Sequence, residues 1–170
     1  NSICYAPNSG DIEGTMISGV ANTTTLSSIS SKYPTAAKQT QAIDASGSSV
    51  AVASNSTATL VAPNYKREGY GFAGWSTDFT ATNSSTIYGP NETINTGDLS
   101  TNGLILYPVW VASAGTLQEF SCASSGLIKA TYDTTNNKMV ATLSSVTALT
   151  DSRDGNVYAV ARLADGKCWM

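Results

Sequence analysis

The chain has 170 residues, a length that allows one domain or two small ones with a hydrophobic core of their own. It carries a net charge of −3, and its nine Lys and Arg residues are scattered, which argues against a nucleic-acid surface built from clustered cations. No apolar run approaches the roughly 18 residues that a membrane-spanning helix needs.

The composition favours strands over helices. Ser and Thr number 23 and 22, together about a quarter of the chain. Thr is frequent in strands and Ser in turns, whereas the strong helix formers Glu, Lys, Arg and Leu are scarce. We therefore expect a mainly β protein.

The first half of the chain contains several segments with the composition of strands. These segments are residues 2–6, 49–53, 57–62, 69–75 and 104–111. Alternation along 69–75 predicts Tyr70 and Phe72 on one face of a strand and Trp75 on the other. Residues 23–43 fit helical spacing only in part, so a helix and an irregular segment are equally open there.

The second half, after the small residues 112–115, is predicted to be a ladder of antiparallel hairpins. Residues 127–132 and 138–143 flank a five-residue turn. Asp154-Gly155 and Asp165-Gly166 are typical of two-residue type I′ turns, which need positive φ at both central residues. Residues 156–163 would then form the middle strand of a three-stranded meander.

Specific motifs in the first half resemble a known family. The matching segments are ICY (3–5), NSG (8–10), REGYGFAGWST (67–77), YGPNETI (88–94) and LILYPVW (104–110). In order and type they resemble the Listeria–Bacteroides repeat, a β-grasp-like module of internalin B-repeats and many bacterial surface proteins. The resemblance implies a β-grasp-like unit in residues 1–111, with an insertion at about 19–48 because the family repeat is shorter.

The second half resembles another family of surface proteins. LTDSRDGNVY (149–158) and GKCWM (166–170) are similar to the opening of the Fibrobacter succinogenes major paralogous domain. That family looks related to the C-type-lectin-like fold, and its chain runs on past the Trp-Met pair. The resemblance implies that residues 112–170 are a β-hairpin unit and the truncated start of such a domain. Both families imply modular surface proteins, such as the large ones of candidate-phylum bacteria.

The residues that most enzymes use are missing or badly spaced. The chain has no His, which removes Ser-His-Asp and Cys-His nucleophile pairs and the commonest metal ligand. Its three Cys lack zinc-ligand spacing, and no phosphate-binding glycine loop is present. The close carboxylate pairs, Asp151 with Asp154 and Asp11 with Glu13, lie in predicted turns. We expect no catalysis, no cofactor and no metal.

Two motifs leave alternatives open. Asp151, Asp154 and Asn156 superficially resemble a calcium loop, but an Asp-Gly hairpin with Arg153 paired to an Asp is favoured because the full loop pattern is absent. Three Trp residues could stack on sugars, but their positions in apolar strands favour core packing. The expected aromatic core consists of Tyr70, Phe72, Trp75, Tyr107, Trp110 and Trp169.

The three cysteines favour an oxidising compartment and one disulfide, although three inert thiols stay possible. Cys122 and Cys168 flank the second unit, and we predict that they are bonded to each other. Cys4 lies in the first strand of the other unit and is expected to stand outside that pair.

These observations predict a non-catalytic bacterial protein at the cell surface, an adhesion or structural module that acts by binding or assembly. The alternative is a subunit of a polymeric appendage, a filament or coat, joined by strand pairing. A carbohydrate-binding module is less favoured. Expected partners are copies of itself, adjoining modules of a longer protein, or a host or neighbouring cell surface, and not nucleic acid.

Overall fold

The computed structural model describes residues 2–5, 49–51, 56–63, 67, 69–95 and 104–170. The structure is mainly β, as the composition predicts. The helix considered within 23–43 and the insertion at about 19–48 lie outside the described residues. In the described part of the chain, no helix has the length and hydropathy needed to cross a membrane.

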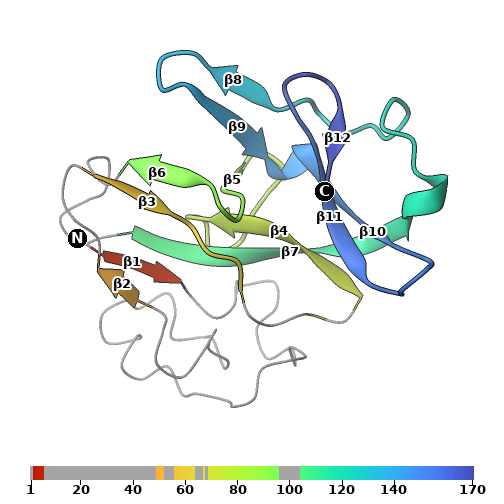
Figure 1. Cartoon of the computed structure of the whole chain (residues 1–170), viewed down its shortest axis with the longest axis horizontal. Coiled ribbons are helices and arrows are strands. Elements are labelled where there is room, and N and C mark those ends of the chain that lie inside the picture. Colours follow the sequence, from red (N-terminus) through yellow and green to blue (C-terminus); the bar gives the residue numbers. More distant parts are fainter. Residues whose placement is uncertain (1, 6–48, 52–55, 64–66, 68, 96–103) are drawn as a thin grey trace.

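Twelve strands and two short 3-10 helices are described, and Figure 1 shows their arrangement. The strands are β1 (Ser2–Tyr5), β2 (Ser49–Ala51), β3 (Thr57–Thr59), β4 (Tyr70–Ser76), β5 (Thr86–Ile87), β6 (Thr93–Asn95), β7 (Leu104–Thr116), β8 (Thr131–Asp133), β9 (Lys138–Thr142), β10 (Val146–Thr150), β11 (Val157–Arg162) and β12 (Cys168–Trp169). The 3-10 helices are η4 (Leu117–Glu119) and η5 (Leu143–Ser145). The main sheet has the order β12-β11-β10-β7-β1-β2, with β4 also paired to β7, and two small sheets are β3-β6 and β5-β9-β8.

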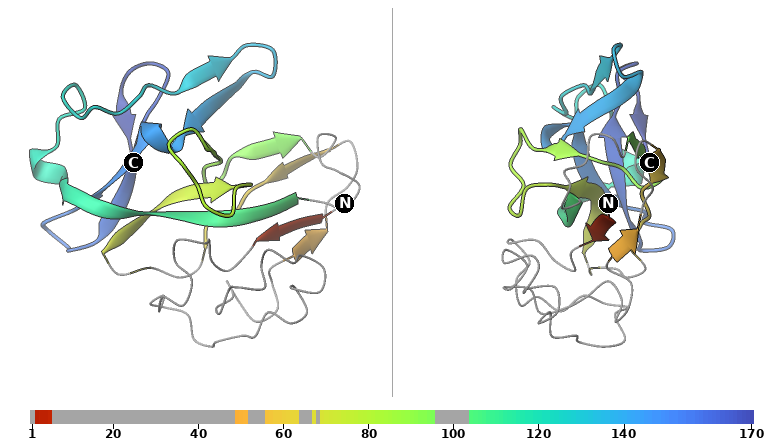
Figure 2. Two further views of the ribbon diagram at one scale, coloured as in Figure 1. Left: turned by 180° about the vertical axis from the view of Figure 1, so that it is seen from behind. Right: turned by 90° about the vertical axis from the view of Figure 1, so that its left-hand side faces the viewer.

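Strand β7 joins the two halves of the molecule. It pairs in parallel with β1 at one end and with β10 at the other, and antiparallel with β4 between them. Seen from behind, it reaches from β1 to the strands of the C-terminal half (Figure 2). The boundary expected at 111/112 therefore falls inside a strand of 13 residues, and one sheet continues across it.

A β-bulge in β4 changes which side chains share a face. The register against β7 shifts between Phe72 and Gly74, and Gly74 has a φ of +138°. A Cβ on Gly74 would lie 2.6 Å from the Tyr88 carbonyl oxygen, so this position requires glycine. The extra residue interrupts the alternation, and the rings of Phe72 and Trp75 meet with centroids 5.1 Å apart. The prediction that they face opposite sides of the strand is wrong for this reason.

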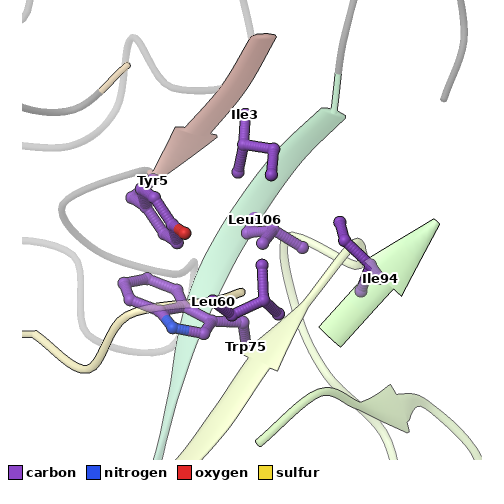
Figure 3. Packing of buried hydrophobic residues seen from close by; sticks show 6 residues of the cluster. All are labelled: Ile3, Tyr5, Leu60, Trp75, Ile94 and Leu106. Carbon is purple, nitrogen blue, oxygen red and sulfur yellow. The ribbon is translucent and has the colours of Figure 1, made fainter. Parts of the chain in front are cut away.

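The first core cluster is built around Trp75, which is fully buried (Figure 3). Its indole Nε1 donates a hydrogen bond to the Val61 carbonyl at 2.7 Å, so the polar end of the ring is satisfied. The Tyr5 ring packs against it at 4.9 Å. The cluster consists of Ile3, Tyr5, Leu60, Trp75, Ile94 and Leu106.

The aromatic residues expected in the core divide into three groups. Trp75, Tyr107 and Trp110 are buried, whereas Tyr70 and Phe72 are only half-buried. Trp169 is 54% exposed, so its assignment to the core is wrong. It lies on β12, a strand of two residues at the edge of the main sheet. An alternating apolar pattern does not bury a side chain where no second layer covers the strand.

The hairpins of the second half form, but their turns differ from the prediction. β10 pairs with β11 and β11 with β12, both antiparallel. Gly155 and Gly166 have φ values of +73° and +82°, whereas Asp154 and Asp165 do not take positive φ. The two loops span residues 151–156 and 163–167 instead of two-residue type I′ turns. Their Asp side chains accept hydrogen bonds from the backbone N–H two residues on, which stabilises longer loops.

Replacing Trp75 tests this core. We expect Trp75→Ala to lower the free energy of unfolding by about 3–5 kcal/mol, because it removes a fully buried ring and its hydrogen bond. Urea denaturation followed by circular dichroism measures the change. Trp169→Ala is the matched control, and we expect it to shift stability by about 0.5 kcal/mol or less. Equal losses in the two variants would contradict the assignment.

Candidate functional site

A disulfide fixes the C-terminal half. Cys122 and Cys168 are bonded, with Cα atoms 5.8 Å apart. The bond ties the segment that follows η4 to the edge strand β12. The backbone of Cys4 belongs to β1, and its side chain lies outside the described part of the structure.

A groove of about 440 Å³ lies where the two halves meet. Its volume falls in the range of roughly 300–1,000 Å³ typical of small-molecule sites. Three stretches far apart in the sequence line it: the chain leading into β4 with the start of that strand, Trp110 of β7, and the β10–β11 loop with the start of β11. The lining residues are Ala62, Pro63, Arg67, Gly69, Tyr70, Phe72, Trp110, Asp154, Gly155, Asn156 and Val157.

The close approach of the β10–β11 hairpin to β4 depends on Gly71. A Cβ at this position would lie 2.9 Å from the Cβ of Ala148 on β10 and 3.1 Å from the Ala159 nitrogen on β11. The first contact is shorter than Cβ atoms normally make, and the second is tight and to backbone, which cannot move aside easily. The small residues Gly71 and Ala148 therefore let the hairpin pack directly on β4.

Arg67 supplies the positive charge of the groove. Its guanidinium lies 3.5 Å from the centroid of the Tyr70 ring, a cation–π contact. The Tyr70 N–H donates to the Arg67 carbonyl at 3.1 Å, and this hydrogen bond closes a turn that keeps the two residues close together. The buried Nε of Arg67 has no hydrogen-bond partner among the described residues.

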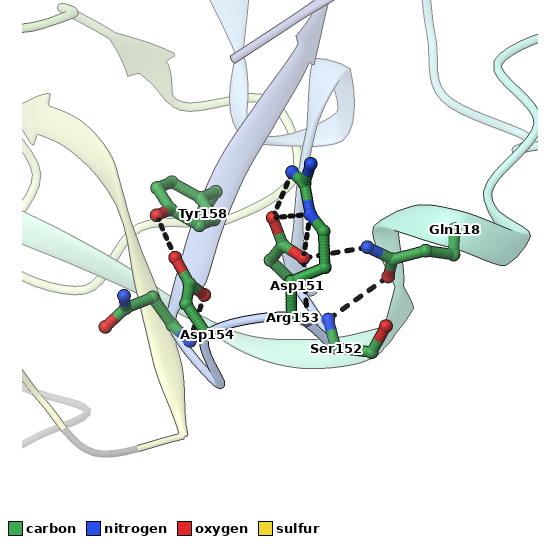
Figure 4. Close-up of polar contacts among 7 residues, drawn as sticks. Gln118, Asp151, Ser152, Arg153, Asp154 and Tyr158 are labelled. Atoms are coloured by element: carbon green, nitrogen blue, oxygen red, sulfur yellow. Dashed lines mark hydrogen bonds and ion pairs between the residues drawn. The ribbon is translucent and has the colours of Figure 1, made fainter.

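Asp154 supplies the negative charge. Its carboxylate accepts hydrogen bonds from the Asn156 N–H at 2.8 Å and the Tyr158 hydroxyl at 2.9 Å (Figure 4). Hydrogen bonds from Asn156, and next the bond from Tyr158, hold the pKa of Asp154 below its usual range. The same carboxylate raises the pKa of Tyr158. Asp154 is therefore ionised at neutral pH.

Asp151, three residues earlier, is buried and shapes the loop. Its carboxylate accepts hydrogen bonds from Gln118 Nε2 at 2.7 Å and from Nε and Nη2 of Arg153 at 2.9 and 2.6 Å (Figure 4). The Arg153 backbone N–H also donates to it at 2.9 Å. The pairing of Arg153 with an Asp is thus confirmed. Among the described residues, no three His, Cys, Asp or Glu side chains are grouped as a metal site would require.

The structure brings together residues that the sequence did not connect. Arg67 belongs to the motif at 67–77, and Asp154 was considered as half of a carboxylate pair and as a calcium-loop residue, but their common groove was not predicted. Trp75 and Trp110 are buried and Trp169 is exposed elsewhere, so these residues do not form a joint sugar-stacking platform. Tyr70 and Phe72 are half-buried because they line the groove. The one sequence feature that could have indicated this groove is Arg67, a cation three residues before the aromatic strand β4.

The groove is suited to non-covalent binding. It combines a cation, an ionised carboxylate, the Asn156 amide and an apolar floor of Phe72, Trp110 and Val157. Comparison with protein-family models, curated proteins and solved structures finds no match for this chain.

The disulfide should contribute substantially to stability. Its partners are 46 residues apart, and closing a loop of that size contributes about 4 kcal/mol in the chain-entropy account. We expect the Cys122→Ser/Cys168→Ser double variant to lose a similar amount in urea denaturation. Cys4→Ser is the control: its stability should still fall on addition of a reductant. If the stability of the Cys4→Ser variant does not change on addition of a reductant, the Cys122–Cys168 pairing is contradicted.

The Asp151 network should make stability depend on pH. Hydrogen bonds from Arg153, and next from Gln118, lower the pKa of Asp151 in the folded state. Its contribution is complete above the unfolded pKa of about 3.9 and is lost as pH falls below it towards the lower folded pKa. We expect Asp151→Asn to melt below the native protein at pH 7, with the difference shrinking towards pH 2. A constant difference across this range would contradict this role.

Proposed function

We propose that this chain is a non-catalytic module of an extracellular bacterial surface protein and acts by binding. The groove at the junction of the two halves carries the proposal. Its lining offers charge, hydrogen bonds and apolar surface together, which is the composition of a recognition site. A binding module needs such a combination of charge, hydrogen-bonding groups and apolar surface, and it needs no reactive group.

The disulfide supports a location outside the reducing cytosol. Structural disulfides persist in secreted and surface proteins and are rare where glutathione and thioredoxin keep thiols reduced. The Cys122–Cys168 bond joins an edge strand to the segment after η4, where it restrains the end of the main sheet. Such a bond suits a module that must stay folded outside the cell.

The resemblance to surface-protein repeats supports the same function. The motif at 69–75 forms β4, and the motif at 104–110 forms the first part of β7. The two strands pair over six registered positions. The most specific part of the resemblance therefore corresponds to one structural unit, which also contributes Tyr70, Phe72 and Trp110 to the groove.

A second candidate function is assembly into a polymer. β12 is the last strand at one edge of the main sheet, and it exposes Trp169 there. An open edge with an exposed aromatic side chain can pair with a strand of another copy. This observation favours a filament or coat subunit, the alternative drawn from the sequence.

A retention assay tests the binding function. We expect the labelled chain to bind at least one surface among intact bacteria, animal extracellular matrix and immobilised cell-wall polymers. Ala62→Trp fills the groove with a bulky side chain and should weaken retention at least tenfold. Ala123→Trp, an exposed position outside the groove lining, is the control and should bind like the native chain. Absence of retention on every surface would refute the proposal.

Light scattering after size-exclusion chromatography separates the two candidates. A monomer at high concentration that still binds supports the module. Growth into large species with concentration, abolished by Trp169→Lys and not by Ala62→Trp, would favour the polymer instead.

A further inference from the structure

Arg67 places a guanidinium in the groove lining that forms no ion pair with the described residues. Its Nε is buried and has no hydrogen-bond partner among the described residues. A buried charged N–H without an acceptor is costly, and such groups in native proteins are normally satisfied by water, an ion or a ligand. The guanidinium carbon lies 3.5 Å from the centroid of the Tyr70 ring, which holds the cation against the aromatic face. The planar fork of an Arg side chain matches the two oxygens of a carboxylate.

Asp154 restricts the charge of what can bind. It is ionised, and its hydrogen bonds from Asn156 and Tyr158 leave part of its acceptor capacity for a ligand. A densely anionic ligand such as a polyphosphate would be repelled by this carboxylate. A ligand with one negative group for Arg67 and neutral hydroxyl donors for Asp154 fits both charges.

The rest of the lining favours a sugar over a peptide. Phe72, Trp110 and Val157 provide an apolar floor of the kind that the C–H face of a sugar ring packs against. Peptides are commonly held through backbone N–H groups. Two backbone N–H groups in the lining are already used within the chain: Asn156 N–H bonds Asp154, and Tyr70 N–H bonds the Arg67 carbonyl. The Arg67 and Asp154 side chains in the lining suit a carboxylate and hydroxyls.

We infer that the groove binds an acidic sugar, a uronic-acid unit of an extracellular polysaccharide, with its carboxylate on Arg67 and its hydroxyls on Asp154. This inference rests on the proposed binding function and names its ligand class. The sugar ring lies on the apolar floor. The groove is open to solvent, so a unit within a longer polysaccharide chain can enter it.

Calorimetry with two matched probes tests the inference on the native 170-residue chain. The probes are an oligogalacturonate and the same oligosaccharide after reduction of its carboxyl groups to alcohols. We expect the acidic probe to bind at least tenfold more tightly. Equal affinity for the two probes would overturn the role of the carboxylate without recourse to any variant.

Three substitutions locate the contact. Arg67→Gln should remove the preference for the acidic probe, and Arg67→Lys should retain only part of it, because Lys keeps the charge and loses the planar fork. Lys129→Gln removes the same charge at an exposed position outside the groove lining and should leave the preference intact. Circular dichroism confirms that each variant is folded. An unchanged preference in Arg67→Gln, or an equal loss in Lys129→Gln, would place binding elsewhere.

The outcomes separate this inference from the function on which it rests. If neither oligosaccharide binds, yet the chain is retained on a surface in a manner sensitive to Ala62→Trp, the sugar class is wrong and the binding function stands. If a peptide with a free C-terminal carboxylate binds through Arg67 more tightly than the oligogalacturonate, the groove is a peptide site. If nothing retains the chain, both proposals fail.

Discussion

Strand β7 is the constraint on which the rest of the structure depends. Its residues from Leu106 to Trp110 are all buried, and it pairs with β1, β4 and β10. Side chains alternate along it, so Leu106 enters the cluster around Trp75, while Val109 enters a second cluster with Ala73, Ile87 and Val146. Both clusters are therefore organised on opposite faces of one strand. A strand buried on both faces must be nearly continuously apolar, and the run from Leu104 to Val111 has that composition.

The glycines of β4 then decide what can pack against that strand. Gly71 lets Ala148 and the backbone of β11 approach closely, and Gly74 takes the positive φ of the bulge beside Tyr88. Larger residues at these positions would push the hairpin away on one side and break the Trp75–Tyr88 bridge on the other. Tyr70 and Phe72, on either side of Gly71, are only half-buried. That incomplete burial supplies the aromatic part of the groove.

Sequence reasoning predicted the strands whose signals are local. The strand expected at residues 69–75, the apolar run of β7 and the hairpins around Gly155 and Gly166 all appear, although a bulge interrupts the alternation of β4. It failed where a distant partner makes the strand: residues 112–115 have the composition of a linker, yet they extend β7 because β10 pairs there and the hydroxyls of Ser113 and Thr150 bond at 2.7 Å. The groove could not be predicted from the sequence for the same reason: it depends on contacts between distant segments. No spacing rule relates Arg67 to Asp154, since only the packing of β10 and β11 on β4 brings their segments together.

The β10–β11 loop, which carries Asp154, is stabilised by its own hydrogen bonds. The Asp151 N–H donates to the Asn156 carbonyl at 2.8 Å, and the Gly155 N–H donates to the Asp151 carbonyl at 2.8 Å. The Asp151 carboxylate meanwhile anchors the loop to Gln118 at the end of β7. Asp151 thus stabilises the loop, while Asp154, three positions later, lines the groove. A loop ordered before a ligand arrives loses little entropy on binding, so a small groove with few contacts can still bind usefully. The same hydrogen bonds hold Asp154 beside β4, so under the proposed function a ligand would be selected by its chemical match to the groove.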